Sequence, residues 1–344
     1  MTTTGSPPRS EPVPAPAADG RGWWARAVEL ALGRRELSIA VVAIALYLYF
    51  LNSVTDFAST ANLQTLGTFI AATAIIAAGQ VFLMISGEID LSVGQTFALA
   101  AFIVAWLAED GVPLLLAVLI ALAACAVIGL VNGVITTVVG VSSFITTLGM
   151  FFFLNGLTLS LSDGRPIDTP GGDTYTKFMG GGAWSGILWA IAITLALQLV
   201  LMRTRWGLHT FAVGGNLLGS REAGINVRWV KTRNFMLAAV LAGFAGIIEA
   251  VRITSTDPLA GGANIMFAAI SAAVIGGTAL AGGSGTVIGA FIGACVLGIL
   301  RDGFTLQGVS AFTFDLILGL AILAAMVLDI YVRRVRGRGG RDTS

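Results

Sequence analysis

The sequence predicts an all-α integral membrane protein with about ten transmembrane helices, and three observations support this fold class. The 344-residue chain is 56% hydrophobic and only 11% charged, whereas soluble proteins carry about 25% charged residues. Its mean hydropathy is +0.87. Ten apolar runs follow one another, most of them close to the roughly 20 residues that a membrane-spanning helix needs. The runs cover residues 37–54, 66–86, 91–107, 113–139, 142–162, 184–203, 235–252, 267–283, 285–300 and 312–332.

The regions outside the apolar runs are short. Residues 1–20 contain most of the chain's nine prolines, and their composition predicts a disordered cytoplasmic tail. Residues 21–36 combine two tryptophans with an Arg and Glu face, which favours an amphipathic helix in the headgroup layer. Residues 37–332 would form the transmembrane domain, and residues 333–344 a basic cytoplasmic tail. Runs separated by only a few residues predict broken or re-entrant helices.

The distribution of Lys and Arg residues predicts the orientation in the membrane. With ten crossings and the N-terminus inside, sixteen of the 20 basic residues fall on the inner side. We therefore expect both termini and the segment 203–234 in the cytoplasm of a multi-pass plasma membrane protein. The net charge of +1 gives no sign of a nucleic-acid partner, because such a partner would require a large basic excess.

The most informative short segment is Gly87–Gly94 (GEIDLSVG), which places two acids and a hydroxyl between adjacent apolar runs. A charged side chain at membrane depth costs about 2.5–3.5 kcal/mol on insertion scales, so Asp90 is a candidate for a substrate pathway. The structural alternative is that Asp90 or Ser92 caps the following helix by accepting its free N–H groups. The two roles are compatible. For Glu88 we expect a solvated side chain.

The chain partly repeats itself, since residues 87–105 and 276–294 align without a gap and share seven identical residues. Chance similarity between two Gly- and Ala-rich helices is the alternative to a duplication. Paired segments interrupted by glycine are typical of transporters, whose site lies at the interface of the repeats. Glycines four apart let another helix approach closely, from this chain or from a second subunit. The packing glycines are expected to be Gly87, Gly94, Gly283, Gly285, Gly289 and Gly293, with Gly129 and Gly133 repeating the device.

The segment GEIDLSVG resembles the signature of the integral-membrane permeases of ribose-, xylose- and arabinose-type ATP-binding-cassette importers. Residues 276–294 resemble the second glycine-rich segment of that family, and residues 212–227 (AVGGNLLGSREAGINV) resemble the stretch that packs on the ATPase subunit. The resemblance covers about residues 37–332. It implies a permease that imports a monosaccharide by alternating access, as a homodimer, with cytoplasmic ATPase subunits and an extracytoplasmic sugar-binding protein.

The inner segment supports an interface by its own residues as well. A helix of about two turns over residues 216–223 would present Leu217, Leu218 and Arg221 outward. Exposed leucines beside an arginine favour a protein interface over a solvated loop. The two leucines and Glu222 depart from the family's usual pattern. The residues expected to contact the ATPase are Gly215, Asn216, Leu217, Leu218, Arg221, Glu222, Gly224 and Ile225.

A monosaccharide is neutral and rich in hydroxyl groups, so its pathway needs only weak hydrogen-bonding side chains. Each such side chain has a structural alternative, an interhelical hydrogen bond worth about 0.6 kcal/mol. The candidates for the substrate pathway are Glu88, Asp90, Ser92, Gln95, Asn132, Thr146 and Asn155.

We expect no enzyme activity and no bound cofactor from this chain. It lacks a G-x-x-x-x-G-K-[ST] phosphate loop, so ATP and Mg²⁺ would bind the partner ATPase. The sequence offers no His, Cys, Asp and Glu cluster at metal-ligand spacing and no pairing of a nucleophile with a base. The sole histidine, His209, is expected on the surface of the inner segment, and Cys125 and Cys295 are expected to be packing residues.

Two other transport functions are alternatives. An ion-coupled secondary transporter would use Glu88, Asp90, Glu249 and Arg252 to relay protons or bind a cation, although the spacing of Glu249 and Arg252 favours a structural ion pair. A branched-chain amino-acid permease of the same superfamily would need charged groups to pair with a zwitterion. The outer segment 163–183 is either a docking site for a substrate-delivering protein or a flexible loop.

Overall fold

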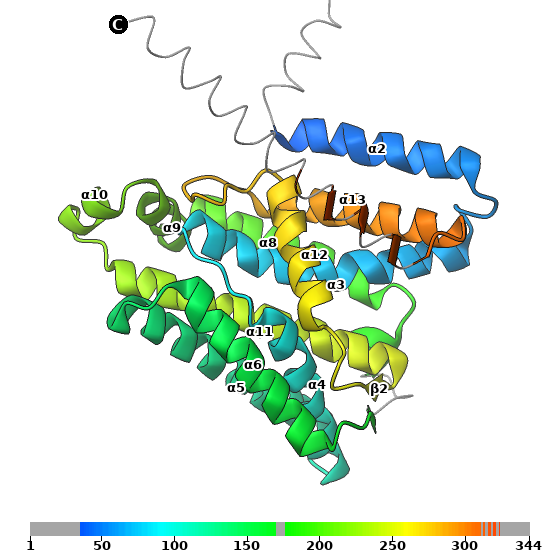
Figure 1. Cartoon of the computed structure of the whole chain (residues 1–344), viewed down its shortest axis with the longest axis horizontal. Helices are drawn as coiled ribbons and strands as arrows, with labels where there is room; N and C mark the ends of the chain where they lie inside the picture. Colours follow the sequence, from blue (N-terminus) through cyan, green and yellow to red (C-terminus); the bar gives the residue numbers. More distant parts are fainter. Residues whose placement is uncertain are drawn as a thin grey trace, which may run out of the picture.

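The computed structural model describes residues 35–169 and 176–310, followed by residues 312, 313, 316, 317, 319, 320 and 323. Most of this described chain is helical and only two short strands occur in it (Figure 1), which confirms the all-α class. The predicted tails at 1–20 and 333–344 lie outside the described residues. So do nearly all of the predicted headgroup helix at 21–36 and much of the tenth apolar run.

The helices and strands follow one another closely along the chain. The first half contains α2 (Arg35–Ser53), α3 (Thr60–Ile85), α4 (Val93–Glu109), α5 (Leu114–Val134), the π-helical segment η1 (Ile135–Val139), α6 (Ser143–Ser162), β1 (Ile167–Asp168) and the π-helical segment η2 (Lys177–Gly181). The second half contains α8 (Ser185–Arg203), α9 (Arg205–Gly215), α10 (Leu217–Glu222), α11 (Val227–Ile253), β2 (Ser255–Thr256), α12 (Gly262–Ile275) and α13 (Val287–Leu306). β1 and β2 pair in antiparallel register.

Seven helices of the described chain are long and apolar enough to cross a membrane: α2, α3, α5 with η1, α6, α8, α11 and α13. Two further apolar helices, α4 and α12, have 17 and 14 residues, fewer than the roughly 20 that a span requires. Nine of the ten predicted runs thus contain a described helix. The two short helices fit the expectation of broken helices.

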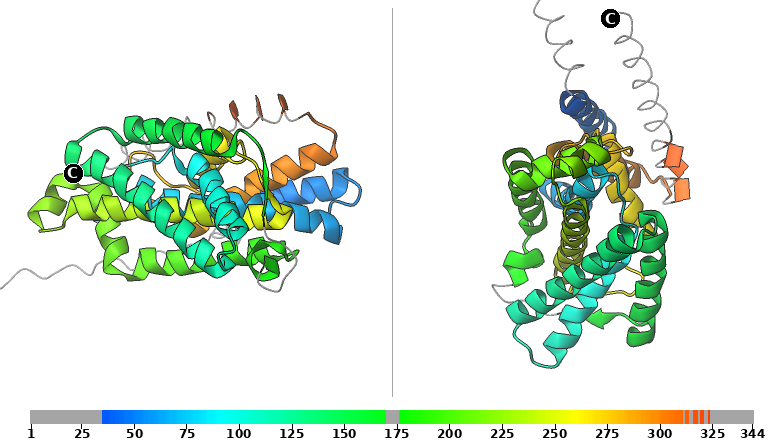
Figure 2. Two further views of the ribbon diagram at one scale, coloured as in Figure 1. Left: turned by 90° about the horizontal axis from the view of Figure 1, so that it is seen from below. Right: turned by 90° about the vertical axis from the view of Figure 1, so that its left-hand side faces the viewer.

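The long helices form one bundle whose two ends differ. α13 runs beside α2 and α3 along the long axis, and α12 crosses them steeply (Figure 1). α9 and α10 lie at one end of this axis and β2 at the other, here called the α10 end and the β2 end. The right-hand view of Figure 2, along the axis, shows several helices nearly end-on. α3 lies deep in the bundle, because every residue from Ala74 to Ile85 is buried.

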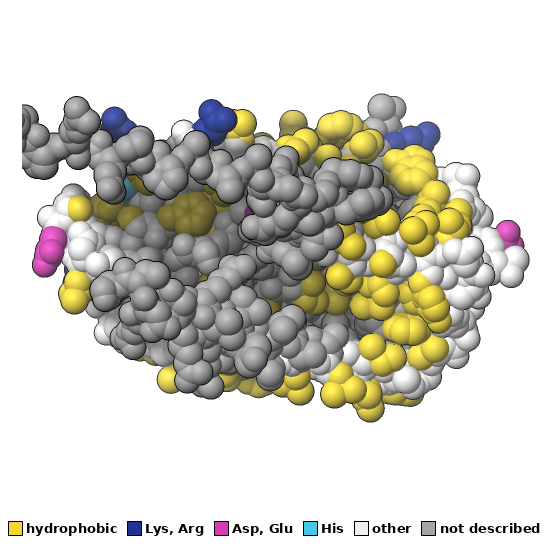
Figure 3. All heavy atoms as spheres, turned by 90° about the horizontal axis from the view of Figure 1, so that it is seen from above, with side chains coloured by type: hydrophobic (Ala, Val, Ile, Leu, Met, Phe, Trp, Pro, Cys, Tyr) yellow, Lys and Arg dark blue, Asp and Glu magenta, His cyan; other side chains and the backbone are white. Residues whose placement is uncertain are grey.

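The outer surface of the bundle is apolar. Figure 3 shows hydrophobic side chains over much of the described surface on one face, with acidic side chains at its two ends. Leu115 on α5, Phe152 on α6 and Leu188 on α8 are each more than half exposed. Soluble proteins rarely expose so much contiguous apolar surface. Such a surface fits a helix bundle surrounded by lipid.

α5 and α11 touch backbone to backbone at two points. A Cβ atom on Gly129 would lie 2.5 Å from the carbonyl oxygen of Phe235, and one on Gly133 would lie 2.7 Å from the Cα of Thr232. Only glycine permits this approach. The predicted packing role of Gly129 and Gly133 is confirmed, and their partner helix belongs to the same chain.

The helix predicted at 235–252 begins earlier than expected. The side chain of Asn226 accepts the N–H of Trp229 at 3.1 Å, which caps α11 so that it starts at Val227. The segment 203–234 therefore consists of α9, α10 and the first turns of α11. Charged residues in those turns interrupt the apolar pattern, so an apolar run does not mark the start of the helix.

The end of α12 corrects both the helix predicted at 267–283 and the gapless repeat. Gly277 (φ +88°) closes α12 by donating its N–H to the carbonyl three residues earlier at 2.9 Å. Gly87 (φ +80°) closes α3 in the same way at 3.0 Å. Gly87 therefore corresponds to Gly277 and not to Gly276. The connection that follows α12 is also longer than the one that follows α3.

Candidate functional site

The segment Gly87–Gly94 folds back from the end of α3 into the bundle. Gln80, more than one turn before the end of α3, donates its amide Nε2–H to the carbonyl of Asp90 at 2.5 Å and accepts the N–H of Asp90 at 3.4 Å. The N–H of Leu91 donates to the hydroxyl oxygen of Thr147 on α6 at 3.0 Å. α4 therefore starts inside the bundle, at the depth of Gln80.

Three of the predicted pathway residues form one fully buried polar cluster. Asp90 Oδ1 accepts the backbone N–H of Ser92 at 2.8 Å and the hydroxyl of Ser92 at 2.6 Å. Asn132 on α5 donates its Nδ2–H to Ser92 Oγ at 2.9 Å and lies 3.4 Å from Asp90 Oδ2. All three residues are 0% exposed. The carboxylate thus holds the turn that precedes α4, but neither Asp90 nor Ser92 caps the helix by accepting one of its N–H groups.

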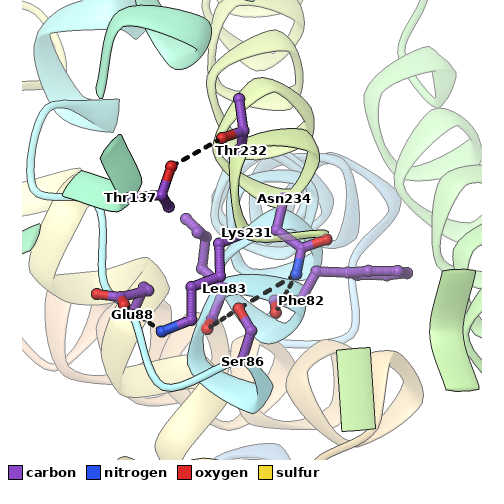
Figure 4. Close-up of polar contacts among 8 residues, drawn as sticks. All are labelled: Phe82, Leu83, Ser86, Glu88, Thr137, Lys231, Thr232 and Asn234. Carbon is purple, nitrogen blue, oxygen red and sulfur yellow. Dashed lines mark hydrogen bonds and ion pairs between the residues drawn. The ribbon is translucent and has the colours of Figure 1, made fainter. Parts of the chain in front are cut away.

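Glu88 is not solvated, so that expectation is wrong. Its Oε1 forms an ion pair with Nζ of Lys231 on α11 at 2.5 Å (Figure 4), and each side chain is only 14% exposed. The two residues are 143 positions apart, and nothing in the sequence links them. The ion pair ties the segment Gly87–Gly94 to the start of α11.

The N-terminal ends of the two short helices meet inside the bundle. A Cβ atom on Gly94 would overlap the carbonyl oxygen of Gly262, so the backbones of α4 and α12 are in contact. Gln95 is 3% exposed, and its Oε1 has no hydrogen-bond partner among the described residues. Its Nε2 lies 3.9 Å from the position of a Cβ on Gly262. In transporters, the partial positive charge of such broken helix ends faces the substrate site.

The last two pathway candidates lie on α6 and are separate from each other. Thr146 is 8% exposed, and its hydroxyl has no hydrogen-bond partner among the residues the structure describes. Asn155 lies more than two turns further along the helix and is partly exposed. The seven candidates therefore do not converge on one point in this chain. Among them, Gln95, Thr146 and the Oδ1 atom of Asn132 offer buried oxygens without a hydrogen-bond partner in the described chain.

At the α10 end, α10 forms the short helix that the sequence predicts. Asn216 caps it by accepting the N–H of Gly219 at 2.9 Å. Leu218 is 69% exposed and Leu217 is 38% exposed, as expected for an interface. The neighbouring interface candidates Gly215, Arg221, Glu222 and Gly224 are also exposed, and Ile225 is partly buried.

An open cleft of about 350 Å³ lies beside α10. It is lined by Arg221, Ile225, Asn226, Val227 and Arg228. Two arginines on the wall of one cleft favour a partner surface with acidic groups, because complementary charges speed encounter and reject wrong partners. The described surface at this end is therefore suited to a soluble protein partner.

Three segments meet at the carbonyl oxygen of Ile85, the last residue of α3. This oxygen accepts the N–H of Gly283 at 2.8 Å. A Cβ atom on Gly214 of α9 would overlap the same oxygen and would lie 2.7 Å from the nitrogen of Gly283. The inner segment thus touches both the end of α3 and the second glycine-rich segment, at Gly283.

Gly289 and Gly293 pack α13 against α12 of the same chain. A Cβ atom on Gly289 would overlap the carbonyl of Gly276, and one on Gly293 would overlap the carbonyl of Ala272. Gly285 precedes α13, so a continuous helical glycine face that includes it is wrong. A Cβ there would instead lie 2.8 Å from the Thr278 side chain.

Sequence reasoning missed two residues that position the segment Gly87–Gly94, namely Gln80 and Thr147. A signal for Gln80 was present, because an amide inside the apolar run 66–86 must find a hydrogen-bond partner when it is buried. Thr147 has no comparable signal, since a threonine within a helix satisfies itself by donating to a carbonyl one turn earlier, here Ser143 at 2.7 Å.

A second ion pair lies within α11. Glu249 and Arg252 form the predicted ion pair near the β2 end, with contacts of 2.6 and 2.9 Å. Within the described ranges, no group of three His, Cys, Asp or Glu residues could hold a metal ion.

Long apolar helices, two short helices that meet within the bundle and an exposed helix at one end together define a membrane transport protein with a surface for a soluble subunit. The family model described as "Branched-chain amino acid transport system / permease component" matches residues 62–326. The chain belongs to this permease family. It is a multi-pass plasma membrane protein and a transport subunit, not an enzyme.

Curated relatives are similar over most of the chain. The xylose/arabinose import permease protein XylH of Sulfolobus acidocaldarius is 37% identical over 312 residues, 87% of this chain and 85% of that protein. The ribose import permease protein RbsC of Escherichia coli K12 is 38% identical over 266 residues, 74% of this chain and 81% of RbsC. RbsC of Bacillus subtilis is 37% identical over 278 residues, which are 80% of this chain and 86% of that protein. No solved structure matches the chain.

Proposed function

We propose that the chain is the permease subunit of an ATP-binding-cassette importer that moves a monosaccharide into the cytoplasm by alternating access. One observation carries this proposal: relatives aligned with 74% to 87% of the chain are import permeases for ribose, xylose or arabinose. The broken helices α4 and α12 support it, because transporters place the substrate site where such helix ends meet.

The substrate pathway would pass the junction of α4 and α12. A sugar offers hydroxyl groups and no charge, so it needs hydrogen-bonding oxygens more than an ion-pair partner. Gln95 and Thr146 have buried oxygens without partners among the described residues, and they are the first candidates for contact. Asp90, Ser92 and Asn132 would hold the start of α4 in place beside them.

The α10 end would face the cytoplasm and bind the ATPase subunit. Arg203, Arg205 and Arg228 are exposed there, as the preference for Lys and Arg on the inner side requires. ATP and Mg²⁺ would bind that subunit. The chain would act as a homodimer with both termini inside, and an extracytoplasmic sugar-binding protein would dock at the β2 end.

An ion-coupled transporter is a weaker interpretation of the same fold. Two of the acids that it would use are held in ion pairs, Glu88 with Lys231 and Glu249 with Arg252. A carboxylate that relays protons must be free to change its protonation state, and an ion pair with a cation favours the charged form.

Reconstitution tests the proposed function. The permease is placed in proteoliposomes with the ATPase and binding protein that co-purify with it, and uptake of D-ribose, D-xylose and L-arabinose is measured with and without ATP. We expect uptake of one of these sugars that requires ATP and both partners. Uptake by the permease alone, driven by a proton or sodium gradient, would overturn the proposal.

Leu218→Asp tests the ATPase surface. The side chain is 69% exposed, so the substitution should leave the fold intact and weaken co-purification of the ATPase. Leu259→Asp is the matched control, because Leu259 is 70% exposed but lies between β2 and α12, away from the α10 end. Equal loss of the ATPase in both variants, or in neither, would contradict the assigned surface.

A further inference from the structure

A buried amide near the start of α11 joins three helices. Asn234 is 0% exposed. Its Nδ2 donates to the carbonyl of Phe82 at 3.0 Å and to Ser86 Oγ at 3.2 Å, both at the end of α3 (Figure 4), and lies 3.4 Å from Thr210 Oγ1 on α9. Its Oδ1 accepts the indole N–H of Trp206 on α9 at 2.8 Å. One side chain thus connects α11 with α3 and α9.

Trp206 strengthens the same connection. Its ring packs on Phe82 of α3, with centroids 5.4 Å apart. The guanidinium of Arg233 lies 5.1 Å from the Trp206 ring centroid and 5.7 Å from that of Trp229, so the cation stands between an α9 ring and an α11 ring. Such cation–π contacts are strongest when desolvated. α9 is therefore fixed to both α3 and α11 through one indole.

The ion pair between Lys231 and Glu88 extends this connection to the segment Gly87–Gly94. Lys231 and Asn234 are three residues apart, so they lie on one face of α11. Their partners, Glu88 and Ser86, flank Gly87 (Figure 4). The start of α11 thus holds the chain on both sides of the glycine where α3 ends.

Folding of the turn does not require the ion pair. The turn at Gly87 is already closed by backbone hydrogen bonds, since the Gly87 N–H donates to Met84 at 3.0 Å and the Glu88 N–H to Leu83 at 3.0 Å. The ion pair adds a link between two elements that these backbone hydrogen bonds do not make. Its geometry fits the transfer of a displacement from one element to another.

α9 contacts α3 through backbone atoms, so no flexible side chain lies between them that could absorb a motion of α9. The backbone of α9 at Gly214 rests on the carbonyl of Ile85 without an intervening side chain. A displacement of α9 therefore acts on backbone atoms at the end of α3. The far end of the segment Gly87–Gly94 is hydrogen-bonded through Ser92 to Asn132 on α5. Glycines of α5 in turn pack directly against the backbone of α11.

We propose that Asn234 and the Lys231–Glu88 ion pair are positioning residues that pass a movement of α9 and α10 to the segment Gly87–Gly94, and so to the start of α4. This inference rests on the proposed function. None of the three side chains needs to touch substrate. Their role is to make closure of the ATPase move the helix ends at the junction of α4 and α12.

The test uses the full complex in proteoliposomes, with whichever of D-ribose, D-xylose and L-arabinose the wild type transports. Two variants break the ion pair, Lys231→Met and Glu88→Gln. A third exchanges the charges, Glu88→Lys with Lys231→Glu. The exchanged pair is the control, because it keeps both charged side chains at the same two positions and restores their attraction. The readouts are sugar molecules imported per ATP hydrolysed and the stimulation of ATPase activity by the sugar-loaded binding protein.

We expect both single variants to assemble with the ATPase and to lose at least about fivefold in imported sugar per ATP, the lower end of ordinary coupling between two sites. The charge exchange should restore part of that loss. Unchanged coupling in both single variants would overturn the inference, as would no recovery in the exchanged pair.

Asn234→Ala provides a second measurement. It leaves buried groups without partners, so lower yield is its expected first effect, and coupling is measured only on assembled complex. There it should fall as in the ion-pair variants, and normal coupling would contradict the role of Asn234. Failure of the wild-type complex to import sugar with ATP would count against the proposed function, whereas a working wild type with unaffected variants would count against this inference alone.

Discussion

The backbone contact at Gly214 predicts that alanine changes the stability of the protein differently at two neighbouring residues. Gly214 and Gly215 end α9. A Cβ atom on Gly214 would overlap the carbonyl oxygen of Ile85, whereas one on Gly215 would have no described atom within 4 Å. Gly214→Ala should therefore destabilise the protein, and Gly215→Ala should be neutral or stabilising.

The expected magnitude follows from the contacts. Relief of the overlap must separate α9 from α3, and overpacking of this kind costs about 1–3 kcal/mol. The hydrogen bond from Gly283 to Ile85, 2.8 Å long, would be lost with it, at about 0.5–1.5 kcal/mol. Alanine is the better helix former by about 1 kcal/mol, which offsets part of this loss. The net loss at Gly214 is about 0.5–3.5 kcal/mol.

Denaturant titration of the purified permease in one detergent measures both variants without any partner protein. The comparison is the free energy of unfolding of each alanine variant against the wild type. The reasoning is refuted if Gly214→Ala is as stable as Gly215→Ala, because α9 would then not rest on α3. A loss in Gly215→Ala of similar size would refute it equally, since the free space at that position would not exist.

The remaining predictions use the same titration. Thr147→Val should lose about 1–3 kcal/mol, because the buried N–H of Leu91 loses its acceptor, while Thr146→Val should be neutral or stabilising, since its hydroxyl has no partner among the described residues. Equal effects of the two valines would contradict the hydrogen bond. Arg252→Met should cost at most about 1 kcal/mol, because its pair with Glu249 is partly exposed, and a larger loss would show that the pair is desolvated.

Composition and apolar runs were sufficient to predict the helical membrane fold, because burial in lipid requires long apolar helices whatever their packing. The same reasoning found α10, since Asn216 and the two leucines carry local signals for a cap and an exposed face. It misplaced the start of α11, where Arg228 and Lys231 interrupt the apolar pattern although the chain is already helical. Helix ends depend on caps and charges, which apolar runs do not report.

Contacts between distant segments could not be predicted from one sequence. The pairing of Glu88 with Lys231 and the bonds of Asn234 to α3 and α9 depend on how the helices pack. No local pattern marks them, because an amide or a carboxylate looks the same whether its partner is water or a residue many positions away. The pathway candidates were chosen by chemistry alone, and the structure separates those with hydrogen-bond partners from those with free oxygens.

The direct contact of α5 with α11 limits how this protein can change shape. Helices separated by long side chains can slide or roll, because rotamers adjust to the new spacing. Where Gly129 and Gly133 bring main chain against main chain, a roll of either helix would drive atoms into each other. These two helices must move together as one rigid body, so bending during a transport cycle has to occur elsewhere in the bundle.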